Sequence, residues 1–480
     1  MLFSTRSKKQ ATPSEAIVKG LADDGGLFIF DDFSSFCFDK SLCGLDYSSL
    51  AKKVLTFFFD DFSKEYIGKV VDEAYSTDNF SKPVDIRSFG ETHYLELFHG
   101  PTCAFKDMAL TVLSGLIEGA KANLNDSSRT LILTATSGDT GSATLSGFKN
   151  GDIKAIVLYP QGGVSPVQEA QMLHFAVNGS RAIAVEGNFD DCQTLVKKIF
   201  ADKSFSHNVK LSSANSINIG RLIPQVVYYM FTYLRLVESG EINFGEEIVF
   251  SVPTGNFGDI LAGFIAKKAG VPISKLICAS NANDVLTEFF KTGVYNRKRP
   301  FYKTISPSMD ILVSSNLERL LYLLSGDADY VSGLMKDLAE KGEYAVNDKI
   351  IKGFKDFYPF ALGDSGTASE IKETFKEQGY LIDPHTAVAS AALKAFRRDT
   401  GYKGAGVVVS TASPYKFALP VSDALGLEEC EVFKAIEDLE NHTESPAPAA
   451  IKSLKNEEFS RTVWKRTEAE ENLKKLISEY

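Results

Sequence analysis

Residues 246–270 read EEIVFSVPTGNFGDILAGFIAKKAG, so that signals for a strand, a glycine-rich loop and a helix follow one another directly. The continuous apolar run IVFSV is typical of a strand buried on both faces, because a half-exposed strand would alternate apolar and polar residues. The run ends at Pro253, and an apolar helical pattern follows the loop. The stretch therefore predicts one unit of a parallel sheet that helices cover on both faces.

Two further stretches follow a similar plan. They read TLILTATSGDTGSATLSGF at residues 130–148 and GAGVVVSTASPYKFA at residues 404–418. Each has an apolar, β-rich run followed by a loop of small residues, and the first then continues with a helical pattern. In open α/β sheets, ligands bind at the carboxyl ends of the strands. We therefore expect the three loops to converge and form the active site.

The loop PTGNFGD at residues 253–259 has the composition of a phosphate cradle. Its two glycines, Gly255 and Gly258, permit positive φ angles and a close approach of the backbone. Successive N–H groups can then point at an anion beside the positive end of a helix dipole. The alternative is an ordinary strand-to-helix turn, because short glycine patterns are common.

The loop SGDTGSA at residues 137–143 is also a glycine-containing loop before a helical pattern, and it could likewise bind an anion. It carries more hydroxyl groups, which come from Ser137, Thr140 and Ser142. Backbone N–H groups and hydroxyls at a helix N-terminus can hold a substrate carboxylate. The alternative is a simple helix cap, for which Ser, Asp and Thr are favoured in any case.

The stretch HGPTCAFKDM at residues 99–108 places Lys106 among apolar neighbours, with Phe105 before it and Met108 and Ala109 beyond. A lysine in a partly apolar pocket is pushed toward its neutral amine, which can attack an aldehyde and form a Schiff base. Together with a phosphate cradle elsewhere in the chain, this indicates pyridoxal phosphate. The alternative is a lysine that lays its stem across apolar surface and keeps its charge in water.

The chain of 480 residues is longer than one hydrophobic core usually supports, so that we expect two or three domains. Residues 1–90 contain the phenylalanine cluster LTFFFDDF and few strand-loop-helix signals, which predicts an N-terminal helical module. Residues 91–444 form the expected catalytic region. Residues 445–480 begin with the linker SPAPAA and continue as a charged helical tail that carries the only tryptophan, Trp464.

Composition excludes several classes of function. The net charge of −10 argues against a general nucleic-acid or anionic-membrane surface. No apolar run approaches the length of a membrane span, and the first residues lack the apolar core of a secretory signal, so that we expect a cytoplasmic protein. The cysteines have neither disulfide nor zinc-site spacing and we expect no metal; they are Cys37, Cys43, Cys103, Cys192, Cys278 and Cys430.

These motifs belong to a longer series through which the chain resembles the threonine synthase family, pyridoxal-phosphate enzymes of the tryptophan-synthase-β group. The similarity covers nearly the whole chain and follows the longer bacterial and fungal branch. Its motifs occur in one order: FSTR (3–6), GLADDGGLF (20–28), FHGPTCAFKD (98–107), TATSGDTGSA (134–143), NSINIGRLIPQ (215–225), PTGNFGD (253–259), SNANDVLTEFFKTG (280–293), SPSMDILVSSNLERLL (306–321), DPHTAVA (383–389) and STASPYKF (410–417).

The resemblance implies a fold type II α/β enzyme with two open, mostly parallel domains and the cofactor in the cleft between them. The smaller domain would span roughly residues 100–220. Lys106 would bind the cofactor as a Schiff base. Thr411 would contact the pyridine nitrogen, although Ser413 is an alternative for this contact. The phosphate loop would contain Gly255, Asn256, Phe257, Gly258 and Asp259.

By resemblance, the substrate is O-phospho-L-homoserine, which carries a phosphate of its own and therefore requires a second anion site. Arginine and lysine supply charge-assisted hydrogen bonds to phosphate. The candidates for this site are Arg221, Lys303, Asn316 and Arg319, while Ser137, Asp139 and Thr140 are expected to contact the rest of the substrate. The alternative for each basic residue is a solvated ion pair on the surface.

The implied reaction converts O-phospho-L-homoserine and water to L-threonine and phosphate by γ-elimination followed by addition of water at the β carbon. Lys106 would be the cofactor's anchor and the general base in turn. Two alternatives stay open: a phospho-lyase that releases 2-oxobutyrate, ammonia and phosphate from the same substrate, and an inactive protein of the same fold. The resemblance leaves the protein as a monomer or a homodimer.

Overall fold

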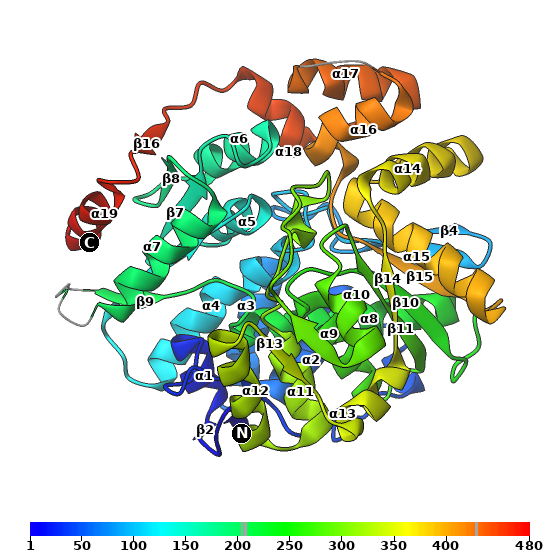
Figure 1. Ribbon diagram of the computed structural model, residues 1–480, viewed down its shortest axis with the longest axis horizontal. Helices are drawn as coiled ribbons and strands as arrows, with labels where there is room; N and C mark the ends of the chain where they lie inside the picture. The colour runs from blue at the N-terminus through cyan, green and yellow to red at the C-terminus, as the bar shows by residue number, and fades with distance from the viewer. Residues whose placement is uncertain (203–204, 206–208, 428–430) are drawn as a thin grey trace.

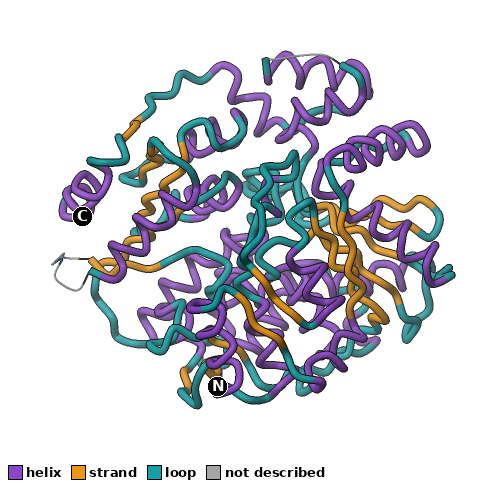
Figure 2. The backbone as a smooth tube through the Cα atoms, in the orientation of Figure 1, coloured by secondary structure: helices purple, strands orange, loops and turns teal. Residues whose placement is uncertain are grey.

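The computed structural model describes residues 1–480 except 203–204, 206–208 and 428–430. Two mostly parallel sheets form the centres of a large and a small lobe (Figure 1). In Figure 2, loops gather between the two groups of strands. The described cysteines are free thiols, and Cys430 lies outside the described residues.

The large lobe is built on a six-stranded sheet with the order β14-β11-β10-β15-β5-β4, in which only the β4–β5 pair is antiparallel. Its strands are β4 (Asp85–Phe89), β5 (Thr92–Glu96), β10 (Ile248–Pro253), β11 (Ile273–Ser280), β14 (Phe357–Ala361) and β15 (Gly406–Ser410). Val408 packs toward α15 (Pro384–Thr400), whereas Val407 and Val409 join the cluster of α8 (Ile219–Glu238) and α9 (Gly258–Lys268). Both faces are buried, which explains the continuous apolar runs.

The small lobe is built on a five-stranded parallel sheet with the order β16-β8-β7-β6-β9. Its strands are β6 (Arg129–Ala135), β7 (Lys154–Pro160), β8 (Arg181–Val185), β9 (Val209–Ser212) and β16 (Thr462–Trp464). One face packs against α7 (Phe189–Ala201) and α19 (Ala469–Ser478), the other against α5 (Asp139–Gly147) and α6 (Pro166–Phe175). The tail that contains Trp464 therefore adds a strand to this sheet as well as a helix.

The N-terminal part contains a small sheet in addition to the helices that the sequence predicts. Its elements are β1 (Leu2–Ser4), β2 (Gln10–Ala11), β3 (Phe28–Ile29), α1 (Pro13–Lys19), η1 (Lys40–Leu42), α2 (Tyr47–Phe58) and α3 (Lys64–Ala74). Phe58, from the predicted phenylalanine cluster, packs its ring 5.4 Å from that of Phe30 and 5.8 Å from that of Phe33. The helices pack on α4 (Asp107–Asn123) and α8, so that this part supports both lobes.

The remaining elements cover the large lobe or join the lobes along its edge. They are α10 (Val285–Thr292), β12 (Val294–Asn296), η2 (Pro307–Met309), α11 (Leu317–Ser325), α12 (Ala328–Glu340), β13 (Glu343–Ala345), α13 (Asp348–Gly353), η3 (Phe354–Asp356), α14 (Asp364–Gln378), η4 (Pro414–Phe417), α16 (Ala418–Leu425), α17 (Val432–Thr443), α18 (Ala449–Lys452) and η5 (Ser453–Asn456). Among the residues described, no helix combines the length and apolar character needed to cross a bilayer.

Helices α4 and α5 approach each other closely at Gly147, the last residue of α5. A Cβ atom added there would lie 2.4 Å from the backbone carbonyl oxygen of Leu110 on α4. Because α4 begins after Lys106 and α5 begins at Asp139, this contact helps to set the distance between the two residues.

We predict that Gly147→Ala lowers the free energy of unfolding by about 1–3 kcal/mol, because the added methyl group meets rigid backbone. Gly333→Ala in α12 is the matched control, since its Cβ would meet nothing within 4 Å. The control is expected to raise stability by up to ~1 kcal/mol through helix propensity. Chemical denaturation followed by circular dichroism measures both, and equal effects of the two substitutions would contradict the close contact.

Candidate active site

Lys106 lies directly before α4, in the segment that follows β5. This segment runs beside the residues that follow β15: the Phe105 N–H donates to the Thr411 carbonyl at 2.8 Å, and the Ser413 N–H donates to the Cys103 carbonyl at 3.1 Å. Since β5 and β15 are parallel neighbours, the end of the sheet holds Lys106 next to Thr411.

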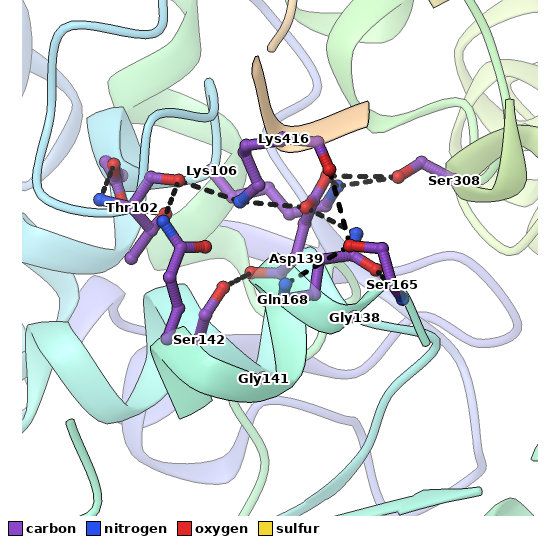
Figure 3. A network of polar contacts seen from close by, with 12 residues as sticks. Thr102, Lys106, Gly138, Asp139, Gly141, Ser142, Ser165, Gln168, Ser308 and Lys416 are labelled. Atoms are coloured by element: carbon purple, nitrogen blue, oxygen red, sulfur yellow. Dashed lines mark hydrogen bonds and ion pairs between the residues drawn. The ribbon is translucent and has the colours of Figure 1, made fainter. Parts of the chain in front are cut away.

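The Lys106 amine faces polar groups in a buried setting (Figure 3). Its Nζ lies 3.3 Å from Oδ2 of Asp139 and 3.4 Å from Oγ of Ser308, and 12% of the side chain is exposed. Burial lowers the pKa of Lys106 below its usual 10.5, against the charge of Asp139, which raises it; Arg221 and Lys416 lower it further. The amine is therefore closer to its neutral, nucleophilic form than a surface lysine is.

Asp139 is the first residue of α5, and its carboxylate is at the centre of the contacts in Figure 3. Oδ1 lies 3.0 Å from Nζ of Lys416 and accepts from Nε2 of Gln168 at 2.8 Å. Oδ2 accepts from Ser308 at 3.1 Å in addition to Lys106. Burial by itself would raise the pKa of Asp139, but the charges of Lys416 and Lys106 outweigh it and hold the pKa well below 3.8.

The rest of the SGDTGSA loop forms the tight start of α5. The N–H groups of Gly138 and Gly141 donate to Oγ1 of Thr136 at 2.9 and 3.0 Å. Gly138 has a φ of +138°, and a Cβ there would collide with Gln168. Ser137 and Thr140 are partly exposed on the same turn, which leaves both hydroxyls available to a ligand.

The loop between β10 and α9 approaches Lys106 through Ser308. A Cβ on Gly255 would lie 2.6 Å from the Ser308 carbonyl oxygen, so that glycine is required there. Asn256 accepts from the backbone and side-chain N–H groups of Asn316, both at 3.0 Å, through its carbonyl. Phe257 has a left-handed φ of +62° and stands at the N-cap position of α9, where its side chain makes no capping hydrogen bond. The first N–H groups of α9 are thus available to an anion.

Asp259 lies in the first turn of α9, beside two tyrosines. Its Oδ1 accepts from the hydroxyls of Tyr228 at 2.6 Å and Tyr229 at 2.7 Å, while its buried Oδ2 has no hydrogen-bond partner among the described residues. Burial raises the pKa of Asp259 to about 6, although both tyrosines and Lys106 act to lower it.

Arg221 lies in the first turn of α8 and is almost fully buried. One of its terminal nitrogens donates to the Ala214 carbonyl at 2.9 Å, but its buried Nε has no partner within the described parts of the chain. Burial lowers the pKa of Arg221 to about 10. A buried guanidinium with a free donor is suited to an anionic ligand.

The other basic candidates lie in different settings. Arg319 is fully buried and donates to the carbonyls of Phe28 at 2.9 Å and Ile217 at 2.6 Å, and also to Asn316. It therefore ties the N-terminal sheet and the start of α8 to the loop that follows β10. Lys303, by contrast, is exposed.

The structure also adds side chains that sequence reasoning missed: Thr102, Gln168, Ser308 and Lys416. Lys416 lies between Tyr415 and Phe417, an apolar sequence setting like that of Lys106. The same reasoning that selects Lys106 could therefore have predicted Lys416 as a site residue. Gln168 and Ser308 carry no such local signal, because only tertiary contacts bring them to Asp139.

Two histidines lie near these residues without contacting Lys106. His385 accepts from the Ser308 N–H at Nε2 and therefore carries its proton on Nδ1, which lies 2.7 Å from Asp383. His99 pairs with Glu96 at 2.8 Å. His385 thus holds Ser308 in place beside Lys106.

The residues fit pyridoxal phosphate. A buried amine of lowered pKa can join the aldehyde, and the uncapped start of α9, with its required glycine, can receive the phosphate. Thr411, which is 6% exposed and adjacent to Lys106, can reach the ring between them.

We predict that Asp259→Asn in the cofactor-free protein changes the pH dependence of stability. A carboxyl whose pKa is raised favours the folded state at low pH, and this contribution is lost as pH rises from about 3.8 to about 6. Between pH 4 and pH 8 the unfolding free energy of the variant should therefore improve relative to the wild type by up to about 3 kcal/mol. Denaturation series at both pH values measure this, and a constant difference would contradict a raised pKa.

Comparisons with known proteins agree along the chain. Residues 92–413 match the family described as "Pyridoxal-phosphate dependent enzyme", residues 1–75 match "Threonine synthase N terminus", and residues 386–476 match "Threonine synthase, C-terminal". The three matches span the N-terminal part, both lobes and the tail.

Individual relatives agree with these matches. The chain is 37% identical over 459 residues to threonine synthase of Saccharomyces cerevisiae, covering 88% of each protein. It is 40% identical over 442 residues to "Threonine synthase-like 1" of Homo sapiens, covering 87% of this chain but only 58% of that longer relative. The pyridoxal-phosphate-bound threonine synthase of Brucella melitensis superposes with a TM-score of 0.87 at 36% identity over 99% of both chains.

These findings confirm the resemblance, the fold type II architecture and the pyridoxal phosphate cofactor that the sequence predicts. The chain belongs to the threonine synthase family of pyridoxal-phosphate-dependent enzymes.

Proposed function

We propose that the protein is a threonine synthase, which converts O-phospho-L-homoserine and water to L-threonine and phosphate. The main support is the position of the Lys106 amine. It contacts Asp139 at the start of α5, and it also contacts Ser308, whose backbone packs against Gly255 in the loop before α9. The lysine therefore lies between the N-termini of α5 and α9, and each N-terminus can bind an anion. This arrangement suits a phosphorylated cofactor together with an anionic amino-acid substrate.

The cofactor site in this proposal consists of Lys106, Thr411 and the loop after β10: Gly255, Asn256, Phe257, Gly258 and Asp259. When bound, pyridoxal phosphate supplies an electron sink for the negative charge that develops at the substrate's α carbon. The first N–H groups of α9 would hold its phosphate, and the Thr411 hydroxyl would donate to its ring nitrogen.

The substrate's amino-acid end lies at the start of α5. The hydroxyls of Ser137 and Thr140 and the first N–H groups of α5 bind the α-carboxylate. Asp139 would orient the substrate's ammonium group. Nζ of Lys106 would be the base that takes the α proton, and its contacts with Asp139 and Ser308 keep it in position.

Arg221 is our first choice for the substrate phosphate, because its buried Nε has no hydrogen-bond partner among the described residues. The start of α8 adds little, since Asn218 already accepts from the N–H groups of Gly220 and Arg221.

Asn316, at the start of α11, is fully buried and its amide donates to the Asn256 carbonyl, so that it holds the loop after β10 rather than the phosphate itself. Arg319 donates to the side-chain oxygen of Asn316 and to the Ile217 carbonyl, so that it holds Asn316 in place and does not itself bind the phosphate. Lys303 is exposed and joins the site only through movement of its segment.

A cavity of about 150 Å³ opens between the lobes beside Lys416 and the residue before Ser308. It is lined by Ser165 and Pro166 of the small lobe, by Pro307 beside Ser308, and by Lys416 and Phe417. Closure of the lobes over this opening would exclude water until the addition step. A cytoplasmic location and a monomeric or homodimeric state stay predictions.

We predict the outcome of a product assay. The pyridoxal-loaded protein, incubated with O-phospho-L-homoserine, should release threonine equal to the phosphate formed, and Lys106→Ala should form neither. Phosphate matched by 2-oxobutyrate and ammonia would instead identify the phospho-lyase. Absence of phosphate release from the loaded wild type would indicate an inactive protein.

We further predict that Arg221→Gln raises KM for O-phospho-L-homoserine by about 10- to 100-fold, because a charge-assisted hydrogen bond contributes about 1.5–3 kcal/mol. Arg235→Gln is the control on the same helix, since Arg235 donates to the Leu45 carbonyl far along α8. Steady-state kinetics measure both variants. An unchanged KM in Arg221→Gln, or equal changes in the two, would remove Arg221 from the phosphate site.

A further inference from the structure

Lys416 is a second lysine that contacts Asp139, and its hydrogen-bond partners match those of an ammonium group. Its side chain is fully buried, and its Nζ lies 3.0 Å from Oδ1 of Asp139 and donates to the Thr102 carbonyl at 2.7 Å. Nε2 of Gln171 also donates to this carbonyl, at 3.0 Å. A carboxylate and a carbonyl can only accept, so that both partners match an ammonium group, which only donates.

The contacts of Lys106 are longer and of a different kind. Its Nζ lies 3.3 Å from Oδ2 of Asp139 and 3.4 Å from the Ser308 hydroxyl. A hydroxyl can donate as well as accept, so that it suits a neutral amine as well as an ammonium. Of the two lysines, Lys106 is therefore the one that loses its proton at the smaller cost.

The charges around Asp139 make such a loss favourable. Two ammonium groups and one carboxylate leave an excess positive charge in a buried setting, which is costly. Arg221 adds to the excess, whereas Asp259 opposes it when ionised. The charged and titratable groups that face Lys106 or Asp139 are Arg221 of α8, Asp259 of α9, His385 of α15 and Lys416 of η4. Lys416 also faces Asp107, the first residue of α4, and the Cys103 thiol, and an ionised Asp107 offsets part of the excess positive charge.

We propose that Lys416 is a positioning residue whose ammonium group neutralises Asp139, so that the Lys106 amine is free to give up its proton. The proposal rests on the proposed role of Lys106 as the lysine that binds the cofactor and acts as base. Without Lys416, the full charge of Asp139 would hold Lys106 as an ammonium, which is neither nucleophile nor base.

The test measures the protonation of Lys106 in cofactor-free protein. Competitive acetylation with acetic anhydride across a pH series, followed by mass spectrometry of the peptide that contains Lys106, gives its pH midpoint. Lys416→Gln removes the charge and keeps a donor for the Thr102 carbonyl. We expect the Lys106 midpoint to rise by about one unit, so that acetylation at neutral pH slows about tenfold.

Three further variants keep the result specific. Lys416→Arg retains the charge and should retain the wild-type midpoint. Lys416→Met also removes the charge and should raise the midpoint as Lys416→Gln does, which keeps the test decisive if the Gln variant does not fold. Lys267→Gln is the matched control, because Lys267 bonds a backbone carbonyl and Asp356 at the far end of α9, and it should change nothing at Lys106.

A Lys106 midpoint that is unchanged or lowered in Lys416→Gln, or raised equally in Lys416→Arg, would overturn the proposal. The measurement uses neither cofactor nor substrate. Its failure is therefore distinct from a failure of the threonine synthase proposal, which the product assay tests separately.

Discussion

The carboxylate of Asp139 is the interaction on which the site depends. It lies at the start of α5 in the small lobe, yet its partners Lys106, Ser308 and Lys416 follow strands or loops of the large lobe. An unpaired buried carboxylate is costly, so that these contacts favour one arrangement of the lobes around the lysine. The same group holds Lys106 in place and adjusts its proton affinity.

The order of strands supplies the other half of the site. Because β10, β15 and β5 are adjacent and parallel, their carboxyl ends present the loop from Gly255 to Gly258, then Thr411, then the segment before Lys106. A cofactor with a phosphate at one end and an aldehyde at the other matches this sequence of groups. We propose that the substrate binds at the start of α5, in the small lobe, and beside the Arg221 side chain in the first turn of α8.

The sequence predicts the local units well, because their signals are local. The run IVFSVP coincides with β10, and its loop and helix follow as expected. The sheet that each strand joins is not a local property: β6 has the same pattern as β10 but belongs to the other sheet. The strands β1, β2 and β3 have two or three residues each, too few to produce a detectable alternation. Ser308 and Gln168 reach Asp139 only through tertiary packing, and Arg319 changes from a candidate ligand contact to a support once its carbonyl partners are known.

The most direct test of this account is to find which lysine joins the cofactor. Lys106 and Lys416 both face Asp139, but only Lys106, which is also the more exposed of the two, has the contacts of an amine that can become neutral. Borohydride reduction of the pyridoxal-loaded protein fixes the cofactor to its lysine, and peptide mass spectrometry then locates it. The account predicts a pyridoxyl group on Lys106 alone, and a label on Lys416 or on any other lysine would contradict it.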